Sequence, residues 1–364
     1  MKKQILIVDD SALFRSVLSD VINSDPRFHV TDLATNGVEA LDLLKKKKFD
    51  AVVLDVHMPK MTGLQLLKEI RMNKIPVKVM MSSTDTVEGA AVTLEALELG
   101  ALDFIHKPKN ALECRNDSFK RKMLHHLAVV ADSKPPVFES VHKIVDDHTT
   151  TAKVVDLVQK HPVHVPGSSI VAIAISTGGP RALHSVIPHL PARLNAPVVI
   201  VQHMPKGFTK SLAERLDQMS EISVKEAEEG DVLQKGQVYI ARGGSHLNIK
   251  KASSGRYTVH YTDQPAREGV KPSANYMYES LADSAYDNIV CTVMTGMGAD
   301  GTEGISYLKQ RRQAYVISQD KATSTVYGMP QSVAKAGLSD QVVALSQIAQ
   351  EIVMQVGLMD IARH

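Results

Sequence analysis

Residues 170–180 have the sequence IVAIAISTGGP, an unbroken apolar run that ends abruptly in small and polar residues. A short apolar run bounded by turn residues is typical of a buried strand. Pro180 stands where a helix often begins, directly after a turn. The stretch therefore predicts a strand, a tight turn and a helix, with Ser176 on the turn.

The same alternation extends outward on both sides of this stretch. Apolar runs that alternate with segments of helical period occur at 5–8, 51–54, 77–81, 197–201, 288–294 and 315–317. Strands that alternate with helices predict βα units on a parallel sheet. We therefore expect an α/β protein whose two halves each contain a doubly wound parallel sheet.

Two segments interrupt the alternation. Between 110 and 168 only 119–130 has a helical period, and prolines follow it, which predicts a closing helix and then a linker. Between 224 and 261 short strands are separated by glycines, which predicts a small β-meander inserted into the second half. The expected organisation is a domain over 1–125, a linker over 126–168 and a second domain over 169–364.

Length and composition exclude several classes of protein. The 364 residues exceed what one hydrophobic core supports, and a formal charge of +2 is too small to favour nucleic acid as a partner. Cys114 and Cys291 stand far apart and predict free thiols in a reducing compartment. The first apolar run stops at Asp9, and no stretch approaches the roughly 18 apolar residues of a membrane span. We therefore expect a soluble, cytoplasmic protein.

Polar side chains end several of the strands predicted in the N-terminal half. They are Asp9, Asp10, Asp55, the pair Ser82–Ser83, and Lys107. The carboxyl ends of parallel strands share one edge, so these groups should converge there. Any one of them alone is more simply a helix cap or a solvated turn residue. Together, the carboxylates predict a Mg²⁺ site, and Asp55 can act as a nucleophile toward phosphorus.

These residues resemble the pattern of a response-regulator receiver domain, over roughly 1–125. The resemblance rests on Asp9–Asp10, on the sequence DVHMPKMTG at 55–63 and on Lys107–Pro108. It implies a flavodoxin-like fold, Asp55 as phosphoacceptor, Asp9, Asp10 and Asp55 as Mg²⁺ ligands, and Lys107 as a phosphoryl contact. The switch hydroxyl belongs to Ser82 or Ser83; we favour Ser82, because the strand is one residue longer than usual. A histidine kinase would be the phosphodonor.

Three strand ends in the C-terminal half carry Ser176, His203 and Asp300. If their strands are parallel neighbours, the three side chains meet as nucleophile, base and orienting carboxylate. Separately, each has a simpler interpretation, as a helix cap or a structural hydrogen-bonding group. Their order along the chain differs from that of α/β-hydrolases, which disfavours a lipase. Met297, between two glycines, could offer its backbone amide to an oxyanion.

These segments resemble the catalytic domain of the chemotaxis-specific protein-glutamate methylesterase and glutamine deamidase family. The matching stretches are STGG at 176–179, QHMP at 202–205, MTGMGADG at 294–301 and YGMP at 327–330. The resemblance implies Ser176 as nucleophile, His203 as base, Asp300 as its partner and the Met297 amide as oxyanion donor, with no cofactor for the ester chemistry. This sequence departs from the family pattern at Ala174, Arg242, Val270 and Asn275.

The substrates implied are γ-glutamyl methyl esters, and some glutamines, on cytoplasmic helices of methyl-accepting chemotaxis receptors. Membrane contact would then be only indirect, through the receptors, and we expect a monomer. The receiver would obstruct the triad until it is phosphorylated, although the connector could equally be a loose tether. A DNA-reading output domain is the main rival, but 169–364 has no clustered basic helix. A scaffold that has lost activity is the second rival.

Overall fold

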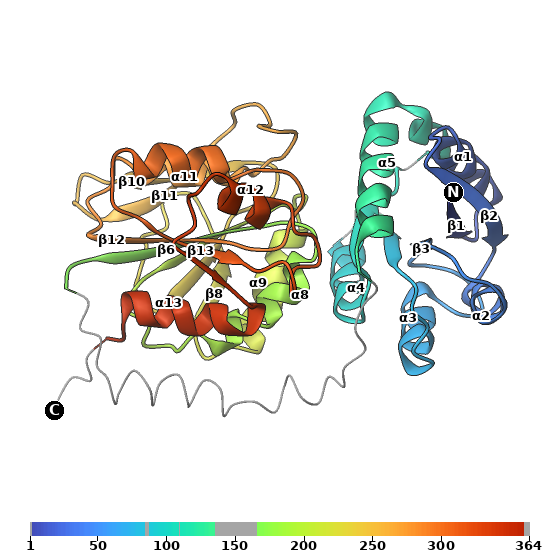
Figure 1. Ribbon diagram of the computed structural model, residues 1–364, viewed down its shortest axis with the longest axis horizontal. Helices are drawn as coiled ribbons and strands as arrows, with labels where there is room; N and C mark the ends of the chain where they lie inside the picture. The colour runs from blue at the N-terminus through green and yellow to red at the C-terminus, as the bar shows by residue number, and fades with distance from the viewer. Residues whose placement is uncertain (1, 84–86, 109, 135–165, 360–364) are drawn as a thin grey trace. The chain divides into compact units, whose positions relative to one another are not determined.

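The computed structural model describes residues 2–83, 87–108, 110–134 and 166–359. The chain divides into two compact units, Met1–Glu139 and Ser140–His364, which are treated separately below (Figure 1). Most of the predicted linker, 135–165, lies outside the described residues. Within them, no helix is long and apolar enough to cross a membrane.

The N-terminal unit contains one parallel sheet with the strand order β2-β1-β3-β4-β5. Its strands are β1 (Lys3–Val8), β2 (Phe28–Ala34), β3 (Ala51–Asp55), β4 (Val79–Ser83) and β5 (Asp103–His106). Its helices are α1 (Ala12–Asn23), α2 (Gly37–Lys46), α3 (Gly63–Met72), α4 (Val87–Glu98), the 3₁₀ helix η1 (Ala111–Arg115) and α5 (Asp117–Asp132). This doubly wound sheet confirms the fold predicted for the first half.

Local sequence explains where these helices begin and what they bury. Ser11 caps α1, and Thr62 forms a capping box with Gln65 at the start of α3. The apolar faces of α1 and α5 pack on one side of the sheet, where Ile7 and Leu127 join the same buried cluster. Because α5 belongs to this core, the N-terminal unit extends to at least Asp132, past position 125.

The C-terminal unit is built on a sheet with the order β14-β13-β12-β6-β7-β9-β8, and all its neighbouring strands are parallel. The strands are β6 (Ser169–Ile175), β7 (Val198–Gln202), β8 (Ser223–Glu226), β9 (Gln237–Ile240), β12 (Asn288–Val293), β13 (Tyr315–Gln319) and β14 (Gln341–Val343). The chain moves from β6 to β7 in one direction and later to β12 in the other. The chain therefore reverses its direction of winding between β6 and β12, which makes this a topological switch point. Ligands bind outside the carboxyl ends of the strands at such points.

Helices cover both faces of this sheet (Figure 1). They are α8 (Gly179–His184), α9 (Phe208–Gln218), α10 (Ala274–Ser280), α11 (Thr302–Lys309), α12 (Met329–Lys335) and α13 (Ile348–Val356), with 3₁₀ helices η2 (Ile187–His189) and η3 (Leu345–Gln347). Side chains of α10, α11 and α12 share a buried cluster with β6, while α13 lies on the other face. Every residue of β6 is buried, as its apolar sequence predicts.

The inserted β-meander is the part of the predicted fold that needs correction. The segment supplies only one antiparallel pair, β10 (His246–Lys251) with β11 (Tyr257–Thr262). Strands β8 and β9 run parallel to each other and extend the main sheet beside β7. Their connection is not a hairpin, because a hairpin joins antiparallel strands. It lies beside β11, where the Gly230 amide donates to the Val259 carbonyl and Val232 pairs with Thr258.

Candidate active site and phosphorylation site

Ser176 lies on the tight turn between β6 and α8. Its amide donates to the Thr295 carbonyl at 3.0 Å, and its own carbonyl accepts from the Gly179 amide at 2.8 Å. Gly178 has a φ of 78°, a left-handed conformation that favours glycine. A Cβ on Gly179 would stand 1.9 Å from Oε1 of Gln202, so a larger residue there would displace the Gln202 side chain. The sequence STGG thus places the serine on a sharp turn at the sheet edge.

His203 follows β7, the strand next to β6. Ile175 is the register partner of Gln202, and the His203 amide donates to the Ile175 carbonyl at 3.1 Å. The imidazole is therefore held beside the turn that carries Ser176. Its Nε2 lies 2.7 Å from Oδ2 of Asp300, whereas Nδ1 is buried and has no hydrogen-bond partner among the described residues.

Asp300 lies beyond β12 in the turn that precedes α11. Besides His203, three groups donate to its carboxylate: the Ser273 hydroxyl at 2.6 Å and the amides of Ala274 and Asn275 at 2.6 and 3.1 Å. Burial acts to raise the pKa of Asp300, but the hydrogen bonds from His203, Ser273 and Ala274 outweigh it and lower the pKa. An ionised carboxylate only accepts hydrogen bonds, so Nε2 of His203 donates, and in the neutral imidazole the lone pair is then on Nδ1.

The glycine-rich loop at 294–301 passes close to Ser176. A Cβ on Gly296 would stand 2.8 Å from Cβ of Ser176, and Gly296 in turn pairs with the segment at Tyr327. The next residue is Met297, whose backbone amide donates to no residue in the described part of the chain. The loop therefore brings a free amide to the same edge as the serine.

A second cluster lies at the carboxyl edge of the N-terminal sheet. Nζ of Lys107 lies 2.7 Å from Oδ2 of Asp9 and 2.6 Å from Oδ2 of Asp55, and Asp9 and Asp55 are both buried. Burial raises the pKa of Asp55, and Lys107 offsets this only in part. Burial acts to lower the pKa of Lys107, but the carboxylates of Asp55 and Asp9 raise it overall, so the ammonium stays charged.

These side chains fit a hard divalent cation. Carboxylate oxygens of Asp9, Asp10 and Asp55 lie within 4.8 Å of one another, and oxygen ligands of this kind are what Mg²⁺ prefers. Asp10 is exposed, so the site is open on one side. That opening leaves room for water and phosphoryl oxygens.

The two serines at the end of β4 differ in their surroundings. Ser82 is the direct register partner of Asp55. The hydroxyl of Ser83 instead contacts α4, where it accepts from the Thr93 hydroxyl at 2.7 Å and donates to the Gly89 carbonyl at 3.4 Å. Ser82 is therefore the better placed of the two to contact a group on Asp55.

Other polar residues of the active site were not predicted as site residues from the sequence. Ser273 and Asn275 reach Asp300 from the start of α10, and Gln202 donates to the carbonyls of Ser176 and His203 at 3.0 and 3.3 Å. Gln202 could have been found, since it ends a strand next to the serine. Ser273 follows no strand, so nothing in the periodicity of the sequence indicates its position.

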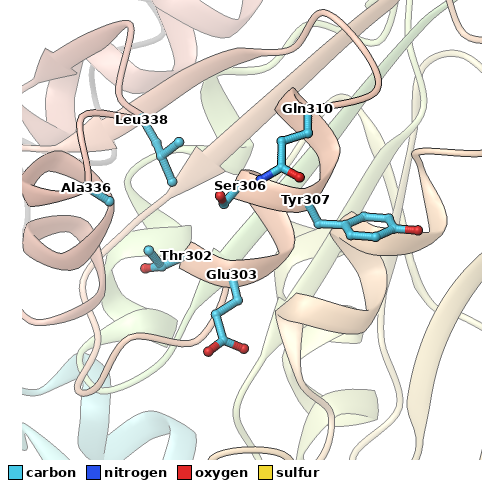
Figure 2. A pocket seen from close by; sticks show the side chains of 7 residues that line it. All are labelled: Thr302, Glu303, Ser306, Tyr307, Gln310, Ala336 and Leu338. Carbon is cyan, nitrogen blue, oxygen red and sulfur yellow. The ribbon is translucent and has the colours of Figure 1, made fainter.

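A pocket of about 350 Å³ lies between α11 and the segment that follows α12 (Figure 2). It is lined by Thr302, Glu303, Ser306, Tyr307, Gln310, Ala336 and Leu338. None of the predicted triad residues lines it. The triad therefore lies at the sheet edge and outside this pocket.

Comparison with known proteins identifies the family. Residues 171–352 match the family described as CheB methylesterase, and residues 5–116 match the response regulator receiver domain. The protein-glutamate methylesterase/protein-glutamine glutaminase of Pyrococcus abyssi is 40% identical over 367 residues, covering 100% of this chain and 97% of that protein. The protein of the same name from Geobacillus kaustophilus is 41% identical over 365 residues, covering 97% and 99%.

Among solved structures, the CheB methylesterase catalytic domain of Thermotoga maritima is 43% identical, with a TM-score of 0.49, and covers 52% of this chain and 98% of that one. The resemblance inferred from the short motifs is thus confirmed by matches that extend over nearly the whole chain. The chain belongs to the CheB family of protein-glutamate methylesterases/protein-glutamine glutaminases, and its residues 5–116 are a response-regulator receiver domain.

Proposed function

We propose that this chain hydrolyses γ-glutamyl methyl esters on chemoreceptors with Ser176 as nucleophile, under control of phosphorylation at Asp55. The observation that carries the esterase assignment is the 2.7 Å contact between His203 and the buried Asp300, one strand away from Ser176. That contact leaves Nδ1 of His203 without a hydrogen-bond partner among the described residues, as a general base for Ser176 requires.

The geometry supports an acyl-enzyme reaction. Nδ1 of His203 takes the proton of the Ser176 hydroxyl as Oγ bonds to the ester carbonyl carbon. The tetrahedral intermediate then collapses, and methoxide leaves as methanol with the proton from His203. Water repeats these steps on the acyl-serine and releases glutamate. Asp300 stays ionised throughout and stabilises the imidazolium, consistent with its lowered pKa.

The Met297 amide is the proposed oxyanion donor. It lies next to Gly296, which is in close contact with Ser176, and it has no acceptor among the described residues. A preorganised amide of this kind stabilises the negative charge that develops on the carbonyl oxygen. The ester chemistry then needs no cofactor.

The proposed substrates follow from the names of the relatives. Both proteins compared above are named for action on protein glutamate esters and protein glutamine. Glutamine differs from the methyl ester only in its leaving group, so the same serine could deamidate it with release of ammonia. We infer that the substrate side chains belong to chemotaxis receptors.

The proposed control acts through the receiver domain. A histidine kinase would phosphorylate Asp55, and Asp9, Asp10 and Asp55 would hold Mg²⁺, which neutralises charge on the phosphoryl oxygens. Lys107 would contact the new phosphoryl group, and Ser82 would serve as the switch hydroxyl, consistent with its register beside Asp55. The unphosphorylated receiver would inhibit the esterase.

Methanol release from methylated receptor membranes tests the esterase proposal. Ser176→Ala and His203→Ala should each lower turnover by a factor on the order of 10⁵ to 10⁶, because the residues of a triad act as a unit. Ser254→Ala, an exposed serine in the turn between β10 and β11, is the matched control and should keep full activity. Near-normal methanol release by folded Ser176→Ala would overturn the serine-esterase mechanism.

A further inference from the structure

Thr295 connects several segments of the active site, although neither its sequence context nor the proposed mechanism gives it a role. It follows β12 and is almost fully buried. Its amide donates to Oε1 of Gln319, at the end of β13, at 2.8 Å. Its carbonyl accepts from the amide of the nucleophile Ser176 at 3.0 Å. The backbone of Thr295 thus connects the serine turn to the ends of β12 and β13.

The side chain of Thr295 makes a further connection. Oγ1 donates to the Thr177 carbonyl at 2.9 Å and accepts from the Val326 amide at 3.0 Å. Thr177 directly follows the nucleophile. The hydroxyl is therefore used both as donor and as acceptor, between the serine turn and the Val326 segment.

Val326 belongs to the segment that supports the proposed oxyanion loop. Its carbonyl accepts from the Gly296 amide at 3.0 Å, and the Gly296 carbonyl accepts from the amides of Gly328 and Met329 at 3.0 and 2.9 Å. The loop is packed without spare room, since a Cβ on Gly296 would lie 2.8 Å from Cβ of Ser176. A shift of the Val326 segment would therefore move Met297 relative to the nucleophile.

We propose that the Thr295 hydroxyl is a positioning group that sets the placement of Ser176 Oγ relative to the Met297 amide. This inference rests on the proposed function. Thr295 acts only through Ser176 and Met297. An oxyanion donor is effective only within hydrogen-bond distance of the developing charge, so a small displacement affects the rate of acylation more than the binding of substrate.

Two substitutions at position 295 separate the hydroxyl from the bulk of the side chain. Thr295→Val keeps the shape but removes the hydroxyl, and its kcat should fall about 10- to 100-fold with little change in KM. Thr295→Ser restores the hydroxyl and should recover most of kcat. Labelling of Ser176 by a fluorophosphonate should slow in parallel in Thr295→Val. The pH profile of kcat/KM should not move. Within the described part of the chain, Thr295 forms no hydrogen bond to His203 or to Asp300.

Thr292, in β12 three residues before Thr295, provides a matched control. It is also fully buried, but its hydroxyl has no hydrogen-bond partner among the described residues, so Thr292→Val should keep kcat. Wild-type kcat in Thr295→Val would overturn the proposal, as would a folded Thr295→Ser as slow as Thr295→Val. If Thr295→Val does not fold, Thr295→Ala takes its place, and a folded Thr295→Ala with the kcat of Thr295→Ser would overturn the proposal. Failure of the proposed function would appear separately, as wild-type protein that releases no methanol.

Discussion

The surroundings of Asp300 fit an ionised carboxylate, because the described residues present only hydrogen-bond donors to it. Four donors converge on its carboxylate, from His203, Ser273, Ala274 and Asn275. An asparagine has the same shape but would direct an NH₂ group at some of these donors. We expect Asp300→Asn to lower kcat by about 10⁴-fold, because the imidazole would lose the acceptor that fixes its tautomer. Steady-state methanol release measures this, with the exposed Asp283→Asn as control.

The same substitution should change how stability depends on pH. The pKa of Asp300 is lowered in the folded protein, so its carboxylate stabilises the fold above the usual aspartate pKa, and this contribution is lost as the pH falls through the lowered value. Below about pH 4, the free energy of unfolding of the wild type should therefore fall more steeply than that of Asp300→Asn. Parallel acid-unfolding curves for the two proteins would contradict this account of the site.

At the scale of elements, the sequence predicted which strand ends meet but not what supports them. The apolar runs that end at Ser176 and His203 predicted neighbouring parallel strands with a common carboxyl edge, because strands buried on both faces of a sheet are typical of parallel sheets. Ser273 could not be found in the same way, because it reaches Asp300 from the start of α10. The position of that helix depends on packing of Tyr278 and Met277 in the core, a non-local contact with no local signal.

The incorrect β-meander has a similar physical cause. Parallel strands usually need a crossover of about a dozen residues or more, and the connection at 227–236 between β8 and β9 is short and has no helical period. A hairpin was therefore the simpler expectation. In the structure the connection is stabilised by pairing with β11, a strand that comes later in the sequence.

The proposed phosphorylation site also depends on several elements, since the ends of β1 and β3 and the loop after β5 meet at Lys107. Incubation with Mg²⁺ and a small-molecule phosphodonor should label Asp55 as an alkali-labile acyl phosphate, and chelation of Mg²⁺ should prevent it. Asp55→Asn should abolish the label, whereas Asp42→Asn, on the exposed side of α2, should retain it. Labelling of Asp55→Asn at the wild-type level would show that another residue is the acceptor.

At the scale of the whole molecule, each unit has a hydrophobic core of its own. Ile7, Val53 and Leu127 belong to a cluster within the N-terminal unit, whereas Ile170, Tyr278 and Cys291 belong to one within the C-terminal unit. Both cysteines are buried and unpaired, as predicted, so no disulfide joins the two units. The proposed control by phosphorylation would then act through contacts between the units that form and break.

An inhibitory receiver makes a quantitative prediction about the separated units. The fragment from Ser168 onward should release methanol faster than the unphosphorylated full chain, and a phosphodonor should raise the rate of the full chain but leave the fragment unchanged. A receiver that covers the site 99% of the time needs only about 2.7 kcal/mol of preference for the closed state. A few charge-assisted contacts supply that amount, and phosphorylation of Asp55 could remove it. Asp55→Asn in the full chain should hold the rate at its low level with phosphodonor present. Equal rates for the fragment and the unmodified full chain would contradict inhibition, and activation by docking to the receptor would then be the mechanism to test.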